Sequence, residues 1–575
     1  MKKSILNLAL ASMLILPGSI ALAVSTNAYS GVGNFDAGLI DNTNFLEMRQ
    51  YETKQRYQET KNPQIIEEEA RQKMELEKTQ QVHFTLRDVV IEKNTVFPTR
   101  DLIKLVDYRI GKQVTINDLI ESANDITDYY QSRGYLSTIA YLPPQKVQNG
   151  VITIVVLEGK YGKVDIKGSK WAKATYVNKT YLADNNISEE NVLNVNDMKR
   201  ALQGINASDY MKGSVELTDN ENSEEYTDVT LNVKDRFPIN LDLRYDNQGR
   251  DLIGRQRGVV YAGMYNVTGR GDNLLGTASF SSRSYGAGAL YSIPIAKNET
   301  KLNIGYSYSH VKLGKQYRDL DITGESNDYF VGVSRRLAKG SDYRLYGDLT
   351  FDMRDSRTDF GFADFADKYR TRTLRGTLTE VKDDFYGKWL LSSAVGVGVP
   401  LMNASDDQTN KAYASNNFVK LNANVARMQI LPKNCLAIFQ LNGQYASRAL
   451  FPSEKMQFGG IASVRGFDEG FFIGDYGVTS SLELRTPIPG LRHILPDKYK
   501  FIDDSIKIAG FYDFGFLGNR FSGEDPTHLM SVGPGVVVKL TKYLSGNIYW
   551  GFPISDKPEG AANSRFHFTL TSNVL

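Results

Sequence analysis

The stretch Asn303-Ile304-Gly305-Tyr306-Ser307-Tyr308-Ser309 places an apolar side chain at every second position and a small or polar one between them. Successive side chains of a β-strand point to opposite faces of the sheet, so this period of two defines a strand with one wet face and one apolar face. The alternation recurs in segments from about residue 238 to the C-terminus. This part of the chain is therefore predicted to consist of antiparallel strands.

These segments are regular enough to be counted, and about sixteen can be placed. They are expected to begin near residues 238, 256, 272, 284, 300, 325, 342, 369, 386, 416, 434, 475, 506, 528, 544 and 564. An even number of strands of about ten residues is typical of an outer-membrane barrel, and a soluble β-sandwich rarely sustains the pattern for so long. Connectors after odd-numbered segments tend to be long and the others tight, except 487–505. We predict a transmembrane β-barrel over residues 238–575.

The composition of the chain is compatible with this prediction. With 575 residues the chain is too long for one ordinary domain. Hydrophobic residues make up 41% and the mean hydropathy is −0.35, as in many soluble proteins. The 33 tyrosines, 27 phenylalanines and 49 glycines nevertheless fit a membrane barrel, because only alternate residues face lipid and aromatic residues form girdles at the interfaces. Composition alone leaves a soluble β-protein open.

Several classes of function are disfavoured. The net charge is +2, with 68 basic and 66 acidic residues and no basic block, so we expect no nucleic-acid partner. Cys435 is the single cysteine, which excludes an intramolecular disulfide, and it is interpreted as a small buried or lipid-facing residue. There is no G-x-S-x-G elbow and no complete G-x-G-x-x-G loop. We expect no catalytic residue, metal site or cofactor. The histidines lie far apart, at His83, His310, His493, His528 and His567.

The N-terminus has the layout of a secretory signal. Lys2 and Lys3 precede an apolar stretch over 5–16 and the small-residue site Ala21-Leu22-Ala23. We predict a signal peptide over residues 1–23; the alternative is an uncleaved membrane anchor, which the Pro17-Gly18 break disfavours. The following residues, 24–81, have few candidate core positions and many charges. They are predicted to form an N-terminal helix and a charged linker.

Compact structure is predicted from Val82 onward. Residues 82–159 have the order strand, helix, helix, strand, strand, with the middle strand expected over 135–141. The second helix is the clearer one, because Leu119, Ala123, Ile126 and Tyr130 line one helical face. Residues 160–235 repeat the layout in degenerate form. The sequence thus predicts two small α/β domains before the barrel.

Two short motifs are more specific than the strand pattern. The first is Val464-Arg465-Gly466-Phe467, in the long connector 448–474, and the second is Phe511-Tyr512-Asp513-Phe514-Gly515, on the thirteenth strand. The alternation places Asp513 in the barrel lumen, where one carboxylate could hold an arginine from a folded-in loop. Either motif alone is more simply a glycine-rich loop or a solvated lumenal aspartate. Together they predict a loop–lumen lock that consists of Val464, Arg465, Gly466, Phe467, Phe511, Asp513 and Gly515.

From about residue 80 to its end the chain resembles the outer-membrane transporters of two-partner secretion, also called haemolysin secretion/activation proteins. Their superfamily also includes the barrel-assembly insertase. Residues 82–159 resemble the family's first polypeptide-transport-associated (POTRA) domain, and 160–235 match the second in layout only. The residues that carry the first match are Gly134, Tyr135, Pro143, Pro144, Gln145, Glu158 and Gly159.

The resemblance also implies roles for individual segments. Arg465 and Asp513 would form the lumenal lock of the family's sixth extracellular loop, and residues 31–50 would occupy the place of the family's plug helix. One departure is the C-terminal sequence Ser572-Asn573-Val574-Leu575, which lacks the terminal aromatic residue typical of outer-membrane proteins. The insertion signal of this chain is therefore expected to be unusual.

By this resemblance the expected function is export, not catalysis. The POTRA domains would lie in the periplasm and capture an unfolded exoprotein, such as a haemolysin or adhesin with an N-terminal secretion domain. The barrel would lie in outer-membrane lipid and form the conduit. The alternatives are an outer-membrane protein insertase of the same superfamily and a passive porin-like channel, while the scarcity of histidine disfavours a lipase or protease. Arg270-Gly271-Asp272 follows an even strand and is expected to be a periplasmic turn rather than an adhesin motif.

Overall fold

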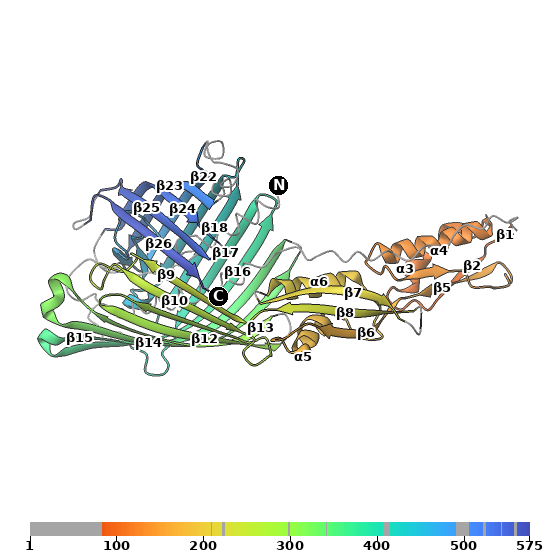
Figure 1. Cartoon of the computed structure of the whole chain (residues 1–575), viewed down its shortest axis with the longest axis horizontal. Coiled ribbons are helices and arrows are strands. Elements are labelled where there is room, and N and C mark those ends of the chain that lie inside the picture. The colour runs from red at the N-terminus through yellow and green to blue at the C-terminus, as the bar shows by residue number, and fades with distance from the viewer. Residues whose placement is uncertain are drawn as a thin grey trace. The chain divides into compact units, whose positions relative to one another are not determined.

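The structure of the chain is a computed structural model (Figure 1). It describes residues 83–574 except 209, 221–222, 224, 297–298, 341, 406–413, 490–504, 521–524, 542 and 557–560. The predicted signal peptide, the predicted plug helix at 31–50 and the linker that follows it lie outside the described residues. The described chain divides into two compact units, which meet in sequence at Pro238 and Ile239.

The first α/β domain is a small sheet covered by one long helix. Its three-stranded sheet has the order β2-β5-β4, with β2 parallel and β4 antiparallel to β5. The helix α4 (Ile116–Gln131) begins with a capping box between Thr115 and Asp118, and its apolar face packs into the core of the domain. The remaining elements are β1 (Phe84–Thr85), β2 (Asp88–Glu92), α3 (Thr99–Ile103), η1 (Asp107–Arg109), β3 (Gln113–Val114), β4 (Ile139–Tyr141) and β5 (Val151–Leu157).

The middle strand of this domain is shorter than predicted. It begins at Ile139 and not at Tyr135, because the four residues before it form a turn in which Thr138 N–H donates to Tyr135 O (3.1 Å). The Tyr135 ring packs edge-on against Phe97 and Tyr130, with centroids 5.7 and 5.9 Å apart. Aromatic packing thus holds residues 135–138 outside the sheet.

The second α/β domain repeats this topology. Its sheet has the order β6-β8-β7, in which the first strand is again parallel and the middle strand antiparallel to the last. The helix α6 begins at the N-cap Asn194, whose side chain accepts from Asn196 N–H. The elements are β6 (Lys160–Lys167), α5 (Ala174–Val177), η2 (Asn178–Leu182), η3 (Ala183–Asn185), α6 (Val195–Ala207), β7 (Met211–Asp219) and β8 (Tyr226–Asp235). No helix among the described residues is long and apolar enough to span a membrane.

In the part of the chain that the structure describes, sixteen antiparallel strands close into a barrel (Figure 1). This confirms the predicted strand number, and every strand begins within four residues of its expected position. The strands are β9 (Ile239–Asp246), β10 (Arg257–Tyr265), β11 (Asn273–Phe280), β12 (Ser284–Ala296), β13 (Thr300–Lys312), β14 (Ile322–Lys339), β15 (Tyr343–Phe360), β16 (Phe365–Asp384), β17 (Gly387–Gly398), β18 (Val419–Ile430), β19 (Leu436–Ala446), β22 (Tyr476–Pro487), β23 (Ile506–Gly518), β24 (Thr527–Lys539), β25 (Leu544–Pro553) and β26 (Arg565–Asn573).

The two faces of the barrel wall differ as the alternation predicts. On β13 the side chains of Ile304 and Tyr306 are 49% and 40% exposed, whereas Ser307 and Ser309 are buried. Most other strands also expose apolar side chains outward, and buried polar and charged groups line the interior. A broad exposed apolar surface is unfavourable in water but suits a wall that faces lipid.

Three neighbouring strands are nearly twice as long as the expected ten residues, or twice as long. The strands β14, β15 and β16 have 18, 18 and 20 residues. The outer parts of β15 and β16 are rich in charge and continue the ladder from Asp352 to Phe360, and Arg372 donates across the pair to Asp355 Oδ1 (2.7 Å). Cross-strand ion pairs support strand pairing in a stretch that has no apolar face, so the apolar alternation understates the length of these strands.

The connector between β19 and β22 folds back into the barrel. It contains the turn η7 (Pro452–Glu454) and a short hairpin of β20 (Met456–Phe458) with β21 (Phe472–Gly474). Its central part, the 464–467 motif, is buried. We call residues 447–475 the lumenal loop.

Candidate functional site

The arginine of the lumenal loop is seated against the barrel wall at β22 and β23. Arg465 Nε donates to Asp513 Oδ2 and Nη2 to Asp513 Oδ1, both at 2.8 Å, and the backbone N–H of Arg465 donates to Asp513 Oδ2 at 2.9 Å. Arg465 is 2% exposed and Asp513 0%. The paired N–H groups match the two carboxylate oxygens, which makes this a strong and directional contact.

The remaining donors of Arg465 reach the neighbouring strand β22. Nη1 donates to Glu483 Oε2 (2.5 Å), and Nη2 donates to Ser481 Oγ (2.9 Å). The Ser481 hydroxyl in turn donates to Asp513 Oδ1 (2.7 Å), which closes a ring of contacts. Arg465 therefore lies between two buried carboxylates.

A second buried arginine balances this group of charges. Arg485 Nε donates to Glu483 Oε1 (2.6 Å), and the Tyr549 hydroxyl donates to the same oxygen (2.7 Å). Two arginines and two carboxylates make the cluster neutral when both arginines are in place. The Arg465 guanidinium also lies 3.7 Å from the Phe511 ring centroid and 4.8 Å from that of Tyr549, so aromatic faces cover its planar surface.

The apolar residues of the two motifs form the seat for the loop. Val464 and Phe467 belong to one buried cluster with Phe458 of β20 and Leu517 and Leu529 of the wall. This seat needs a glycine on β23: a Cβ at Gly515 would lie 2.8 Å from a ring carbon of Phe458 and 2.9 Å from Val464 Cγ2. The glycine of the strand motif thus makes room for the loop.

The loop glycine approaches the opposite edge of the seat. Gly466 has φ +94°, a conformation that L side chains rarely adopt, and its N–H donates to His567 Nε2 (3.1 Å). A Cβ at Gly551 of β25 would lie 2.3 Å from Gly466 N, so two backbones meet here without side chains between them. Because Nε2 accepts, the proton of neutral His567 is assigned to Nδ1, which faces Glu469 Oε1 at 3.5 Å.

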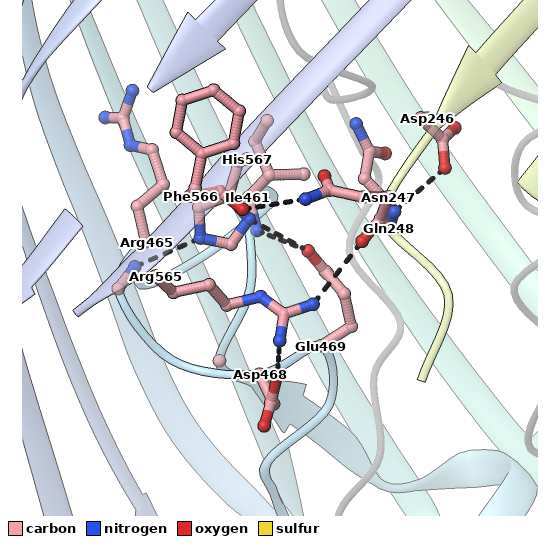
Figure 2. Close-up of polar contacts among 12 residues, drawn as sticks. Asp246, Asn247, Gln248, Ile461, Arg465, Asp468, Glu469, Arg565, Phe566 and His567 are labelled. Carbon is pink, nitrogen blue, oxygen red and sulfur yellow. Dashed lines mark hydrogen bonds and ion pairs between the residues drawn. The ribbon is translucent and has the colours of Figure 1, made fainter. Parts of the chain in front are cut away.

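Figure 2 shows how the next two loop residues reach the junction of the first and last strands. Asp468 forms ion pairs with Arg565 at the start of β26 and with Arg255, which precedes β10 (3.2 Å). Glu469 Oε1 accepts from the N–H of Ile461 (2.9 Å), which closes the loop on itself. The loop therefore contacts both sides of the junction.

The junction itself has a short backbone ladder. The strands β9 and β26 pair over five positions, from Asp246 with Thr569 to Asp242 with Asn573. Beyond them the Asn247 side chain continues the pairing: its Nδ2 donates to Phe566 O (2.7 Å), and its Oδ1 accepts from Phe568 N–H (2.9 Å) (Figure 2). One side-chain amide here replaces a strand residue.

In the first α/β domain, Glu158 is a buried structural acceptor. Its carboxylate accepts from the N–H groups of Thr95 (2.8 Å) and Val96 (2.9 Å), from the Thr95 hydroxyl and from the Tyr130 hydroxyl (2.8 Å). Burial of the phenol, and secondly its hydrogen bond to Glu158, raise the pKa of Tyr130. Glu158 thus ties the loop after β2 to helix α4.

Two signature glycines lie where the two α/β domains join. Gly134 has φ +94°, its carbonyl accepts from Val195 N–H (2.9 Å), and a Cβ on it would lie 2.4 Å from Asn196 Nδ2. Gly159 O accepts from Leu193 N–H (2.8 Å). The Arg133 carbonyl accepts from the amides of both Asn194 and Asn196. These positions therefore connect the two domains.

The Pro-Pro-Gln part of the signature completes the sheet of the first domain. Proline has no N–H to donate to a ladder, so Pro143 and Pro144 follow the end of β4 at Tyr141. Gln145 follows the two prolines and pairs with β5 through its side chain. Its Nε2 donates to Thr153 O, and its Oε1 accepts from Thr153 N–H, both at 2.7 Å. The Gln145 side chain thus makes with the Thr153 backbone the two hydrogen bonds that a neighbouring strand would make.

Glu158→Ala is expected to loosen the first domain. Four donors would lose their acceptor, and the buried Tyr130 hydroxyl among them would be left unsatisfied at a cost on the order of 1–3 kcal/mol. Hydrogen exchange of residues 84–159 in the full-length protein should accelerate by at least about tenfold. The matched control, Glu92→Ala at an exposed position on β2, should leave hydrogen exchange unchanged. Equal exchange in the two variants would show that Glu158 does not stabilise the domain.

The sequence singled out the two motifs but not their partners. Ser481, Glu483, Tyr549, Gly551 and His567 complete the seat and come from three different strands. Lumen-facing polar residues and glycines are common in such a wall, so only the contact with the loop distinguishes these five. Among the described residues, no cluster of potential metal ligands occurs.

Two family models and two known transporters match this chain. A family model described as haemolysin secretion/activation protein ShlB/FhaC/HecB matches residues 225–538, more than half of the chain, and one described as POTRA domain, ShlB-type, matches 84–159. The heme/hemopexin transporter protein HuxB of Haemophilus influenzae is 23% identical over 579 residues, which cover 97% of this chain and 98% of that protein. The outer membrane transporter CdiB of Dickeya dadantii is 23% identical over 82% of this chain and 83% of its own length.

Two solved structures share the fold. CdiB from Escherichia coli has a TM-score of 0.71 at 19% sequence identity and covers 94% of this chain and 100% of its own. BamA from Haemophilus ducreyi, lacking POTRA domains 1–3, has a TM-score of 0.54 at 14% identity and covers 85% of this chain and 100% of its own. These likenesses support the architecture of a barrel preceded by α/β domains.

Proposed function

This chain belongs to the haemolysin secretion/activation protein ShlB/FhaC/HecB family, and from this membership we propose how its own residues export a partner exoprotein. It is a two-partner secretion transporter of the bacterial outer membrane, with its POTRA domains in the periplasm. The client is proposed to be a large exoprotein with an N-terminal secretion domain, such as a haemolysin or an adhesin. We infer that the protein binds and conducts this client and is not an enzyme.

The arginine seat supports this proposal more than any other feature. A closed wall with a loop anchored inside by Arg465, Asp513 and Glu483 is a channel with an internal obstruction. A passive pore would gain nothing from a buried charge cluster that holds a loop in its lumen. A channel that opens only for a client needs such an obstruction, because an open pore would leak.

Capture of the client is proposed to take place in the POTRA domains. Each three-stranded sheet has two edge strands, β2 and β4 in the first domain and β6 and β7 in the second. An unfolded client can add a strand to such an edge, because backbone hydrogen bonds require no fixed sequence. The hydrogen bonds at Gly134 and Gly159 would hold both sheets in one arrangement during capture.

Translocation is proposed to follow displacement of the lumenal loop. The client threads through the barrel and folds outside, and this folding supplies the driving force, since the periplasm offers no ATP. Client binding can displace the loop only if it favours the displaced state by more than the Arg465 contacts favour the seated one. The loop–lumen lock is thus proposed to hold the loop in the one position from which a client displaces it.

A comparison of secreted proteins tests the function and separates the alternatives. Deletion of the gene should remove one large protein from the culture medium while the outer-membrane proteome stays unchanged, and the intact gene should restore it. Mass spectrometry of both fractions measures this result and identifies the client. An insertase would instead change many outer-membrane proteins, and a passive porin would leave the medium unchanged; either result would contradict export.

A further inference from the structure

The first limb of the lumenal loop, residues 447–455 before β20, carries a buried carboxylate that neither motif includes. Glu454 is 3% exposed and forms an ion pair with Lys420 of β18, which also donates to Glu454 O (3.0 Å). Arg375 of β16 lies 3.8 Å from the same carboxylate. Gln444 of β19 donates to Glu454 O (3.1 Å). Cations and an amide of the wall therefore surround this residue.

Neighbouring loop residues contact the same wall. Arg354 of β15 donates to Ser453 O (3.2 Å), and the Phe451 ring stacks on Tyr369 of β16 with centroids 4.9 Å apart and planes 3° from parallel. Phe451 and Ser453 are fully buried. The first limb is thus anchored by charge, backbone contacts and aromatic stacking together.

This anchor and the arginine seat lie on different parts of the barrel wall. The partners of the first limb lie on β15, β16, β18 and β19, which are the seventh, eighth, tenth and eleventh strands in the order of the wall. The partners of Arg465 lie on β22, β23 and β25, the twelfth, thirteenth and fifteenth strands. The lumenal loop is consequently fixed to two adjoining sectors of the wall.

The charges of loop and wall are reversed between the two anchors. At the seat the loop contributes a cation and the wall two carboxylates; at the first limb the loop contributes the carboxylate and the wall the cations. Arg354 has a second partner in Asp328 (2.5 Å) and Arg375 one in Asp352 (3.7 Å), whereas the ion pair of the fully buried Lys420 is with Glu454. Removing Glu454 leaves Lys420 buried without its counter-ion, which is unfavourable.

We propose that Glu454 and Lys420 form a second latch, which holds the first limb of the lumenal loop in the barrel and must be released during export. The proposal rests on the proposed function for the meaning of release, but the position of the loop can be measured without a client. Each latch restrains one limb, so the loss of either exposes its own limb first.

The test measures shielding of the first limb in the full-length, membrane-embedded protein. Cys435→Ser removes the native thiol, and Ser453→Cys then places one buried thiol beside Glu454. Labelling with a membrane-impermeant maleimide should be slow in this background and at least about fivefold faster with Glu454→Gln or Lys420→Met. The heat-dependent shift in gel mobility that is typical of folded barrels shows that each variant is inserted.

Two further variants give the proposal its specificity. The matched control Asp364→Asn changes an exposed acid in a left-handed turn that asparagine tolerates, and it should leave labelling unchanged. The double variant Glu454→Gln with Lys420→Met should label no faster than the quicker single variant, because both changes remove one interaction. Unchanged labelling in the single variants, or fully multiplied rates in the double variant, would overturn the latch.

The outcome is distinguishable from failure of the proposed function. Should Arg465→Ala reduce export while Ser453→Cys remains shielded in the Glu454 and Lys420 variants, the second latch is wrong and the export mechanism stands. Should these variants expose Ser453→Cys while Arg465→Ala exports normally, the latch exists but the loop is no barrier to export.

Discussion

Arg465→Ala should reduce export of the client to about a tenth or less of the wild-type amount, because breaking this buried pair, at a cost of about 3–5 kcal/mol, releases the loop from the one position from which the client displaces it. Without this side chain Asp513 and Glu483 face each other with only Arg485 to balance them, and the loop loses the contacts that position it. A loop that is no longer held in one place is expected to obstruct the lumen in many positions. The client measured in the medium, relative to that in the cells, gives the result.

The matched variant Arg465→Lys separates charge from geometry. Lysine keeps the positive charge but cannot place two parallel N–H groups on Asp513 while also reaching Glu483 and Ser481. Export by this variant should therefore lie between those of the wild type and of Arg465→Ala. Normal export by Arg465→Ala, in a barrel that is inserted at wild-type amount, would remove the lock from the mechanism.

Much of the fold could be predicted from the sequence, because a lipid-facing wall requires alternation at every strand. The strand β13 shows this best, since Ile304 and Tyr306 face outward and Ser307 faces inward. The same signal fails where lipid is not the neighbour. The outer ends of β15 and β16 are charged on both faces, and their ladder is held by pairs such as Arg372 with Asp355. The alternation therefore predicted the positions of the strands better than their lengths.

In the first α/β domain local propensity gave the wrong strand start. The stretch after Gly134 contains Tyr135 and other residues that favour strands, yet the Tyr135 ring packs on Phe97 and Tyr130 and a turn precedes β4. Packing of one aromatic side chain outweighed the preference of a short segment. Such a contact depends on a residue almost forty positions away and cannot be read from the local pattern.

The candidate site was predictable only where the chain carries a motif. The alternation on β23 assigned Asp513 to the lumen, and the loop motif supplied Arg465, so their contact could be expected. Glu483 and Glu454 carry no such signal: Glu483 is the single acidic residue of β22 and Glu454 is one of four in the lumenal loop, but neither stands in a motif. Their roles follow from which wall the folded loop touches, and this depends on the three-dimensional path of the lumenal loop.

A disulfide between the lumenal loop and the barrel wall would show whether the seated loop obstructs the path of the client. In a background with Cys435→Ser and with Phe458→Ala, which makes room for a side chain at 515, Val464→Cys and Gly515→Cys would place two thiols where Val464 Cγ2 now lies 2.9 Å from the position of a Cβ on residue 515. This separation suits a disulfide, and the periplasm and cell surface are oxidising. Each single variant serves as a control for the altered seat.

The disulfide should form without added oxidant, and export should stop while it is intact. Export should resume after reduction, since the loop can then leave its seat. The measurement is the amount of client released before and after addition of a reductant, with the disulfide followed by gel mobility. Failure of the thiols to pair, or undiminished export through the cross-linked barrel, would contradict a client path that the seated loop obstructs.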